Sequence, residues 1–538
     1  MSLLRRSGPA ALGVLVVLAA GLTPGACARS GSAPARHGAI TVAVRTPPNS
    51  LDPRLGSDET SARVSQLVFN ALMRIGDDFQ ARPDLALRLD QPDPTTYIAH
   101  LRPGVRFHDG HLLTSRDVVY TFTSLLAPSS TSPYKGAYRT VASVRALDDL
   151  TVEFRLRAPF AAFPLQLVVP PIVPDGAGEG LRRTPIGTGP YRFTRYAVDD
   201  EVVLSAFPDY WDSAPRNTGI VLRIVPDDTM RGLELKKGTI DLVVNDLPPD
   251  IVFQLERSGV SRVIRSPGLD LSYLGFNLQD AVTRDLRVRR AVGYAINRQA
   301  IIDHLRRGLA RLAFGLIPPE GWAFEPAARQ FRYDPAEARR LLDEAGFPDP
   351  DGDGPRPRLS LTLKISTAEE ARLQATVIQQ DLARVGIELD IRAYEFATLM
   401  SDVVKGNFQL FSLQWVGGAL VDPDILRRVF HSTQVPPVGF NRGRYANAQV
   451  DAAIDRATVA LTEGQRRDGY AVAQRLIAED APYIPLWNRT NAVVARPELR
   501  GVRLGPTGDF QSLRWVERPD PPSGPAPQAL LQELAGHR

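Results

Sequence analysis

The sequence predicts an α/β protein that is large enough to build more than one hydrophobic core. The clearest local pattern covers residues 369–391, where an apolar helical stripe is followed by Gly386 and then by the alternating Ile387, Leu389 and Ile391. A helix that ends at glycine and leads into a strand is typical of an α/β layer. The composition agrees, since 43% of the 538 residues are hydrophobic and 23% are charged.

The amino-terminal segment has the features of an export signal. A basic start is followed by an apolar run over residues 10–22 and by small residues before Cys27. The run is too short to cross a bilayer, which takes about 20 residues. Cys27 is the only cysteine and stands where a lipoprotein signal places its lipidated cysteine, although Pro24 occupies a position where that pattern prefers leucine. We expect a signal peptide over residues 1–26 and lipidation of Cys27, with ordinary export as the alternative.

Charge and cysteine content argue against several classes of function. The 64 basic and 60 acidic residues nearly balance, and the arginines are scattered, so no nucleic-acid-binding stripe is predicted. A single cysteine allows no intramolecular disulfide and no cysteine-based metal cluster. No segment after residue 22 looks membrane-spanning. We also find no Gly-x-Ser-x-Gly elbow and no His-Glu-x-x-His motif, which disfavours a hydrolase.

Two motifs in the first half of the chain could be mistaken for functional sites. His108, Asp109 and His111 suggest a metal site, but two histidines three apart in a turn lack a third ligand. Residues 187–191 (Gly-Thr-Gly-Pro-Tyr) look like a phosphate loop, but they lack its lysine and its following helix. We therefore expect a turn that leads into a helix with Asp117 in its first turn, and a second turn that opens a β-hairpin.

A strand and a helix are predicted in the middle of the chain. Residues 274–277 (Leu-Gly-Phe-Asn) are short and strand-like, and Asp285 can cap a helix. The apolar positions from Val288 to Ile296 then fall on one helical face. This pattern predicts a strand followed by a core helix.

A second helix has both of its ends marked. Asp334 can cap it, Pro335 takes the first helical position, and Gly346 follows the apolar stripe. The next loop, residues 349–354 (Asp-Pro-Asp-Gly-Asp-Gly), has the spacing of a calcium loop, but its twelfth position is Ser360 instead of glutamate. We expect a solvated acidic turn there, with calcium binding as the alternative.

Taken in order, these motifs resemble one protein family. The segments that carry the resemblance are 107–122, 187–191, 274–298, 333–337, 408–424 and 482–487. They are similar to the family 5 extracytoplasmic solute-binding proteins, the peptide and nickel receptors of ABC importers, over roughly residues 39–516.

The resemblance implies a two-lobed periplasmic-binding-protein clamp (a Venus flytrap), with an extra domain inserted in lobe one. The hinge would lie at the crossings 272–275 and 483–486. The tail beyond Arg518 is rich in proline and glycine, and we expect it to be disordered. The implied division is signal peptide 1–26, tether 27–38, lobe one 39–62, 186–274 and 485–516, inserted domain 63–185, lobe two 275–484 and tail 517–538.

The resemblance also implies a function without chemistry on the ligand. A solute would bind between the lobes, and the closed form would be read by the permease and ATPase subunits of an importer. A peptide or peptide-like solute is the leading ligand, while a nickel chelate, an opine or an oligosaccharide stays open. We expect no cofactor, a monomer in the periplasm or at the cell surface, and a lipid anchor in the membrane. A secreted hydrolase is the alternative from another class.

The ligand contacts expected from the resemblance centre on residues 408–424. Peptide receptors of the family carry an aspartate three residues after a tryptophan, where it pairs with the amino terminus of the peptide. Here Gly418 stands at that place after Trp415, and an extra residue precedes Asp422. Asp422 is the nearest replacement, or it caps the helix that Pro423 begins, and Trp415 could instead be a core residue. The candidate ligand-binding residues are Trp415, Gly417, Gly418, Asp422, Trp487, Asn488, Tyr134 and Arg139.

Overall fold

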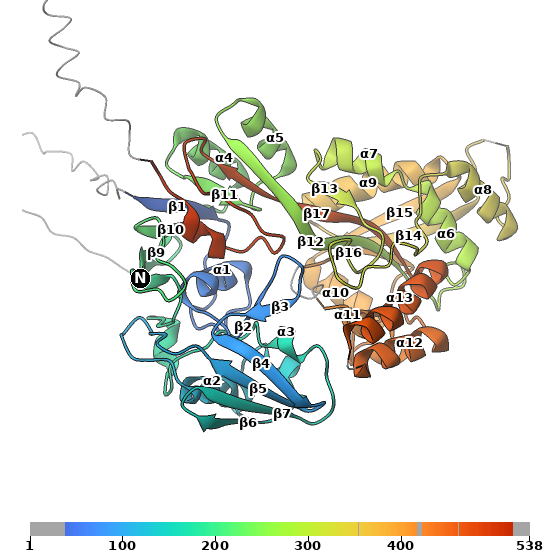
Figure 1. Ribbon diagram of the computed structural model, residues 1–538. Helices are drawn as coiled ribbons and strands as arrows, with labels where there is room; N and C mark the ends of the chain where they lie inside the picture. Colours follow the sequence, from blue (N-terminus) through green and yellow to red (C-terminus); the bar gives the residue numbers. More distant parts are fainter. Residues whose placement is uncertain (1–37, 353, 417–421, 461, 520–538) are drawn as a thin grey trace, which may run out of the picture. The chain divides into compact units, whose positions relative to one another are not determined.

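The computed structural model describes residues 38–352, 354–416, 422–460 and 462–519 (Figure 1). The predicted signal peptide, Cys27, nearly all of the tether, Gly417, Gly418 and most of the tail therefore lie outside the described residues. Eleven strands form the largest sheet: β1 (Ala39–Val44), β8 (Tyr191–Ala197), β9 (Glu201–Ala206), β10 (Gly219–Ile224), β11 (Leu242–Val244), β12 (Arg262–Phe276), β13 (Ala310–Leu312), β14 (Leu359–Ser366), β15 (Ile387–Tyr394), β16 (Leu410–Trp415) and β17 (Tyr483–Ala495).

The sheet has the order β15-β14-β16-β12-β17-β11-β1-β10-β9-β8, and β13 pairs with β17. β1 runs parallel to β10 and β11, while β14 runs parallel to β15 and β16. Between these two parallel groups lie the long antiparallel strands β12 and β17. Their pairing is interrupted between Pro267 and Leu271. The two parallel groups are thus joined through β12 and β17, as Figure 1 shows.

Helices pack on both parallel groups and give each its own core. One core gathers residues of β14, β15, α6, α8 and α9, and another gathers residues of β1, β10, β11 and α1. Outside residues 69–190, the described part of the chain has the α-helices α1 (Glu59–Val68), α4 (Asp228–Lys237), α5 (Pro249–Arg257), α6 (Leu286–Ala295), α7 (Arg298–Ala300), α8 (Pro335–Glu344), α9 (Glu369–Ala383), α10 (Phe396–Lys405), α11 (Ile425–Phe430), α12 (Ala448–Val459) and α13 (Glu463–Asp480). It also has the π-turn η3 (Ile301–Leu305) and the short 3-10 helices η5 (Ser432–Gln434) and η6 (Gln511–Trp515).

A separate four-stranded antiparallel sheet lies in the sequence between β1 and β8. Its strands are β4 (Ala86–Asp93), β5 (Thr96–Leu101), β6 (Val141–Asp148) and β7 (Thr151–Leu156), in the order β4-β5-β7-β6. The same part of the chain holds β2 (Met73–Ile75), β3 (Ala81–Pro83), α2 (Ser115–Leu126) and α3 (Phe163–Gln166). This part of the chain has its own hydrophobic core, which includes Phe107, Phe122 and Phe154.

Two helices begin at the cap residues that the sequence predicts. Asp285 accepts a hydrogen bond from Arg287 N at 2.8 Å and begins α6, which ends at Ala295. Asp334 accepts from Glu337 N at 2.9 Å and begins α8. Gly346 follows with φ +88°, a left-handed conformation that favours glycine. These helices are confirmed because their end signals are local.

The two motifs that imitate functional sites are turns. His108 Nε2 donates to Gly189 O at 2.9 Å, and His108 Nδ1 accepts from Gly187 N at 3.3 Å, so this histidine ties the two motifs together. His111 stacks on Phe107 and contacts Asp109. In the described part of the chain, no group of three or more histidines, cysteines or carboxylates is placed to hold a metal ion. Both motifs take the predicted turns, which lead into α2 and into the hairpin of β8 and β9.

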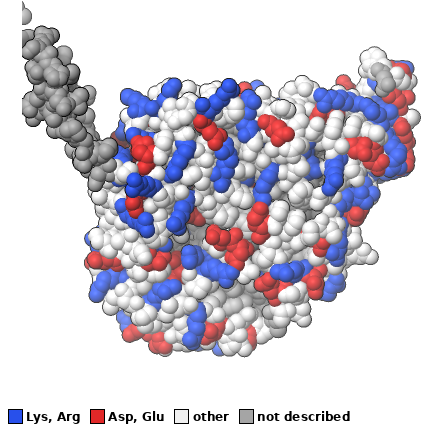
Figure 2. All heavy atoms as spheres, turned by 45° about the horizontal axis from the view of Figure 1, so that its top comes forward, with Lys and Arg blue, Asp and Glu red and all other residues white. Residues whose placement is uncertain are grey.

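The surface carries charges of both signs. Figure 2 shows lysine and arginine interspersed with aspartate and glutamate over the face it presents. Across the described ranges, no helix is both long enough and apolar enough to cross a membrane.

Candidate ligand-binding site

A cavity of about 530 Å³ lies where the carboxyl ends of strands from both parallel groups meet. We call it the central cavity. β1 leads into Arg45 and Thr46, β11 leads into Asn245 and Asp246, and β16 contributes Gln414 near its carboxyl end. In α/β proteins, ligands bind in the crevice outside the carboxyl ends of parallel strands. The central cavity is therefore the first candidate for a ligand site.

Four helices begin at the central cavity. Glu59 of α1, Asp228 of α4, Asp250 of α5, and Glu369 and Glu370 of α9 stand in the first turns of these helices and line it. Carboxylates in a first turn stabilise a helix because its amino-terminal end carries a partial positive charge. The acidic lining thus has a structural role and does not by itself mark a cation site.

Buried arginines hold the cavity walls in place. The Arg63 side chain is 4% exposed, lies 2.6 Å from Asp246, and donates to Val244 O at 3.1 Å. Arg306 pairs with Glu370, and its guanidinium lies 5.9 Å from the centre of the Trp487 ring. Burial lowers the pKa of Arg306 to about 10, and its Nε is buried with no hydrogen-bond partner within the protein. Unlike the Arg63–Asp246 pair, Arg306 keeps one buried donor without a partner within the protein.

The lining of the central cavity is amphoteric. It contains six carboxylates and four guanidinium groups, beside the neutral polar groups of Thr46, Asn245 and Gln414. Such a set can meet an ammonium group, a carboxylate and an amide of one small solute. It offers charge complementarity for a zwitterion.

A second cavity of about 270 Å³ lies between the four-stranded sheet and α13. We call it the aromatic cavity. Tyr97 and Phe160 line it from one side, and Trp322, Asp422 and Arg466 line it from the other. It shares no described lining residue with the central cavity.

Two contacts that the structure describes across the cavities are exposed. Arg307, which follows η3, lies 2.7 Å from Asp250 of α5, and its guanidinium is 5.3 Å from the Phe253 ring centre. Gln80 donates to Glu463 of α13 at 3.3 Å. Exposed ion pairs of this kind contribute about 0–1 kcal/mol each. The parts that they join are therefore weakly held at these points.

Trp415 and Asp422 take different places in the structure. Trp415 is 7% exposed and is surrounded by Tyr273, Phe440 and the Arg442 guanidinium, 5.0 Å from its ring centre. Asp422 lines the aromatic cavity and accepts from Asp424 N at 2.6 Å. α11 begins at Ile425 with Asp424 as its cap residue, so Asp422 stands before the helix that was expected to start at Pro423.

The other predicted site residues that the structure describes lie away from the lining of both cavities. Trp487 and Asn488 are each 1% exposed on β17. Their Nε1 and Oδ1 atoms are buried with no hydrogen-bond partner within the protein. The Tyr134 hydroxyl donates to Gly56 O, and Arg139 is exposed at the end of the short helix η1 (Lys135–Tyr138). The ligand contacts expected of these residues remain predictions.

Sequence reasoning singled out Asp422, which lines the aromatic cavity, but none of the residues that line the central cavity. Arg63, Asp246 and Arg306 come from α1, from the end of β11 and from the end of η3. No shared motif connects them, because the sheet order brings them together over long sequence separations. A signal existed in the carboxylates that follow a cap residue at Glu59, Asp228 and Asp250, since a helix start after a strand marks the crevice edge.

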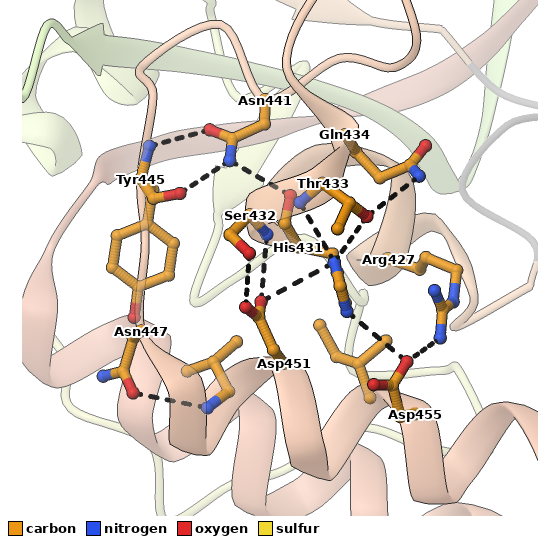
Figure 3. A network of polar contacts seen from close by, with 12 residues as sticks. Arg427, His431, Ser432, Thr433, Gln434, Asn441, Tyr445, Asn447, Asp451 and Asp455 are labelled. Carbon is orange, nitrogen blue, oxygen red and sulfur yellow. Dashed lines mark hydrogen bonds and ion pairs between the residues drawn. The ribbon is translucent and has the colours of Figure 1, made fainter.

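A polar network between α11 and α12 looks like a site but is a structural joint (Figure 3). Asp451 accepts from Ser432 N at 2.9 Å and lies 3.8 Å from His431. Asp455 pairs with Arg427 and lies 3.4 Å from His431. The carboxylates of this network contact described partners and line neither cavity, so we assign no ligand to it.

Comparison with known proteins gives relatives over nearly the whole chain. The dipeptide-binding protein of Escherichia coli is 28% identical over 495 residues, which cover 86% of this chain and 91% of that protein. The glutathione-binding protein GsiB of Pectobacterium atrosepticum is 30% identical over 456 residues, covering 82% and 87%. Among solved structures, NikA from Brucella suis in complex with Fe(III)-EDTA matches with a TM-score of 0.81 at 23% identity, covering 89% of this chain and 99% of that one.

These matches confirm the predicted α/β two-lobed clamp, and they are to substrate-binding proteins of ABC transporters, not to enzymes. Residues 80–437 match the family described as bacterial extracellular solute-binding proteins, family 5, middle. The chain belongs to the family 5 bacterial extracellular solute-binding proteins.

Proposed function

We propose that this protein captures a peptide or peptide-like solute in the central cavity and delivers it to the permease and ATPase of an ABC importer. The amphoteric lining of that cavity carries the proposal. A short peptide is a zwitterion with amide groups, and the cavity offers guanidinium, carboxylate and amide side chains to all three. Relatives named for dipeptide and glutathione binding support the same class of ligand.

The candidate residues fit this proposal in different ways. Arg306 offers a buried donor, and Gln414 brings the segment before Trp415 to the cavity wall. Gly417 and Gly418 carry no charged group, so the charged ends of a peptide need other partners. Trp487 supports the wall indirectly, through its contact with Arg306.

A filled cavity tests this location. Thr46 is exposed and lines the central cavity, so Thr46→Trp should fold and occupy the space. We expect it to weaken binding of the tightest member of a dipeptide panel by at least a hundredfold, measured by calorimetry. Thr123→Trp, on an exposed face of α2, is the matched control and should bind as the wild type does. Unchanged binding by Thr46→Trp would refute the proposal.

The solute can be identified from the small molecules that stay bound to the protein through purification. Mass spectrometry of small molecules released from protein purified without denaturation should find a peptide or a peptide-like amide. A nickel chelate, opine or oligosaccharide in its place would replace the peptide proposal. A peptide that is consumed on incubation, and not merely bound, would favour the hydrolase alternative.

We further propose that Cys27 carries the lipid anchor of a monomeric receptor at the outer face of the membrane. Its position after a short apolar run and small residues supports this. Cys27→Ala should move the protein from the membrane fraction to the soluble extracytoplasmic fraction, as followed by immunoblotting. Cys27→Ser with unchanged membrane attachment would contradict a lipid anchor at this residue.

A further inference from the structure

The long strands β12 and β17 pass from one group of hydrophobic cores to another near their middle. Ile264 of β12 and its partner Val493 of β17 pack with residues of β1, β10 and β11. Leu271 and Trp487 lie in cores that include residues of β16. The change of core on β12 therefore falls between Ile264 and Leu271, before the crossing at 272–275 that the family resemblance implies.

The ladder between β12 and β17 is interrupted at the same place. Pairing runs to Pro267 and resumes at Leu271, so residues 268–270 lie outside the register, and we call them the β12 break. Proline has no N–H to donate to a ladder. A Cβ on Gly268 would lie 2.4 Å from Arg489 O, so the strands approach too closely for any side chain there. The ladder therefore offers little resistance here to a rotation of one core group against the other.

A turn from another part of the chain reaches the β12 break. It consists of residues 76–80, between β2 and β3. Phe79 in this turn is 1% exposed and packs against Leu269 of the break, which is 3% exposed. Ile75 and Leu165 complete this small cluster, which is separate from the larger cores. The part of the chain that holds the four-stranded sheet is thus fastened to the break through one aromatic ring.

The backbone of Phe79 has a conformation that aromatic residues rarely adopt. Its φ is +60°, in the left-handed region, where the Cβ of an L-residue is crowded by the backbone. Phe79 N donates to Gly76 O, and Gly76 N donates to Gln80 O, both at 2.9 Å, which closes the turn. Burial of the ring favours this conformation and the backbone strain opposes it, by amounts of the same order. Such a balance allows two states of the turn, one with the ring buried and one with the backbone relaxed.

The same turn also contacts the second core group. Gln80 Nε2 donates to Glu463 Oε2 of α13 at 3.3 Å. Residues of α13 and of β16 share one core, which lies beyond the β12 break from β1 and β11. A turn of five residues therefore contacts both the break and a helix on its far side.

We propose that the turn of residues 76–80 is a strap that fastens the two lobes in the closed form, with Phe79 docked on the β12 break. When the lobes rotate apart about the break, Leu269 leaves the Phe79 ring and Gln80 leaves Glu463. The ring is then uncovered, and the turn relaxes out of its left-handed conformation. Burial of the ring opposes opening and release of strain favours it, so the strap is a two-state element that lobe closure sets. This inference rests on the two-lobed fold and not on which solute is captured.

The distance between two spin labels tests the strap without any solute. Thr123→Cys on α2 and Arg456→Cys on α12 place the labels at exposed positions of the full chain carrying Cys27→Ser. We expect double electron–electron resonance to find a short distance for the closed form. Phe79→Gly removes both the ring and the strain, and it should lower the short-distance population at least threefold. Leu269→Ala uncovers the ring and should have the same effect.

A matched control separates the docked ring from relief of backbone strain. Asp199 is exposed in the turn between β8 and β9 and has φ +57°, so Asp199→Gly relieves a similar strain and uncovers no ring. It should leave the distances as they are in the wild type. The double variant Phe79→Gly/Leu269→Ala should lose no more of the short-distance population than the stronger single variant, because both changes remove one contact.

Unchanged distances in Phe79→Gly or in Leu269→Ala would overturn the proposal. A double variant whose loss is the product of the two single losses would also overturn it, because the two residues would then act independently. Thermal unfolding shows whether each variant is folded. If Leu269→Ala is not folded, Gln80→Ala replaces it, since this side chain is partly exposed and its change leaves the cores intact. Gln80→Ala should also lower the short-distance population, and no loss in this variant would equally overturn the strap.

Discussion

The contribution of a side chain to the stability of this protein can depend on its protonation state. His108 is the clearest case, because burial lowers its pKa from 6.5 to about 4. Its neutral ring donates to Gly189 O and accepts from Gly187 N. Protonation would place a second N–H against the Gly187 N–H and break this joint. The unfolded chain therefore binds more protons than the folded chain between pH 6.5 and pH 4.

The contribution of His108 is fully present above pH 6.5 and is lost as the pH falls through 4. We expect the stability advantage of wild type over His108→Gln, measured by urea unfolding, to shrink by up to about 3 kcal/mol between pH 7 and pH 4. His111→Gln in the same turn keeps the His108 joint and should retain the wild-type pH dependence. An advantage that is independent of pH would show that His108 titrates alike in both states.

For single residues, the sequence predicted a structural role correctly where the contacting residues are close in sequence. His108 was assigned to a turn because no third ligand followed nearby. Trp415 and Asp422 were placed by their spacing from each other, but the ring cluster around Trp415 and the Arg466 partner of Asp422 come from distant segments. Those partners depend on tertiary packing, which a spacing pattern does not contain.

The helices α6 and α8 begin where local capping predicts. In α8, Asp334 accepts from Glu337 N and Pro335 takes the first helical position. Replacing Asp334 by alanine removes this acceptor and should lower the free energy of unfolding by about 1 kcal/mol. Asp334→Asn keeps a capping side chain and should lose less. Urea unfolding of both variants measures the difference, and equal losses would mean that the cap hydrogen bond contributes little.

The position of the elements relative to one another was not predictable from local signals. Cap residues and apolar stripes gave α6, α8 and most of α9, which ends at Ala383 instead of near Val385. The central cavity needs the carboxyl ends of β1 and β11 beside Gln414 of β16. Strands β11 and β1 pair across about 200 residues of sequence, and this order follows from the packed sheet and not from any one segment.

For the whole molecule, the contacts that hold the closed form together without a ligand decide how easily it opens. Arg307 contacts Asp250 and Phe253, and Gln80 contacts Glu463. The Arg307 and Asp250 side chains are 41% and 65% exposed, so solvent screens their attraction, and such pairs contribute about 0–1 kcal/mol. Because these contacts are weak, we expect a solute to be able to shift the protein from an open to a closed form.

We expect a cognate solute to reduce the radius of gyration in small-angle X-ray scattering and to raise the melting temperature. At about a hundred times its dissociation constant, the stabilisation should reach about 2.7 kcal/mol. Arg307→Ala removes both of its contacts and favours the open form, so it should weaken solute binding by up to about fivefold. Arg340→Ala, on the exposed face of α8, is the matched control and should bind normally. A tightly bound solute that leaves the scattering curve unchanged would rule out closure, because a ligand shifts an equilibrium only by its differential affinity for the two forms.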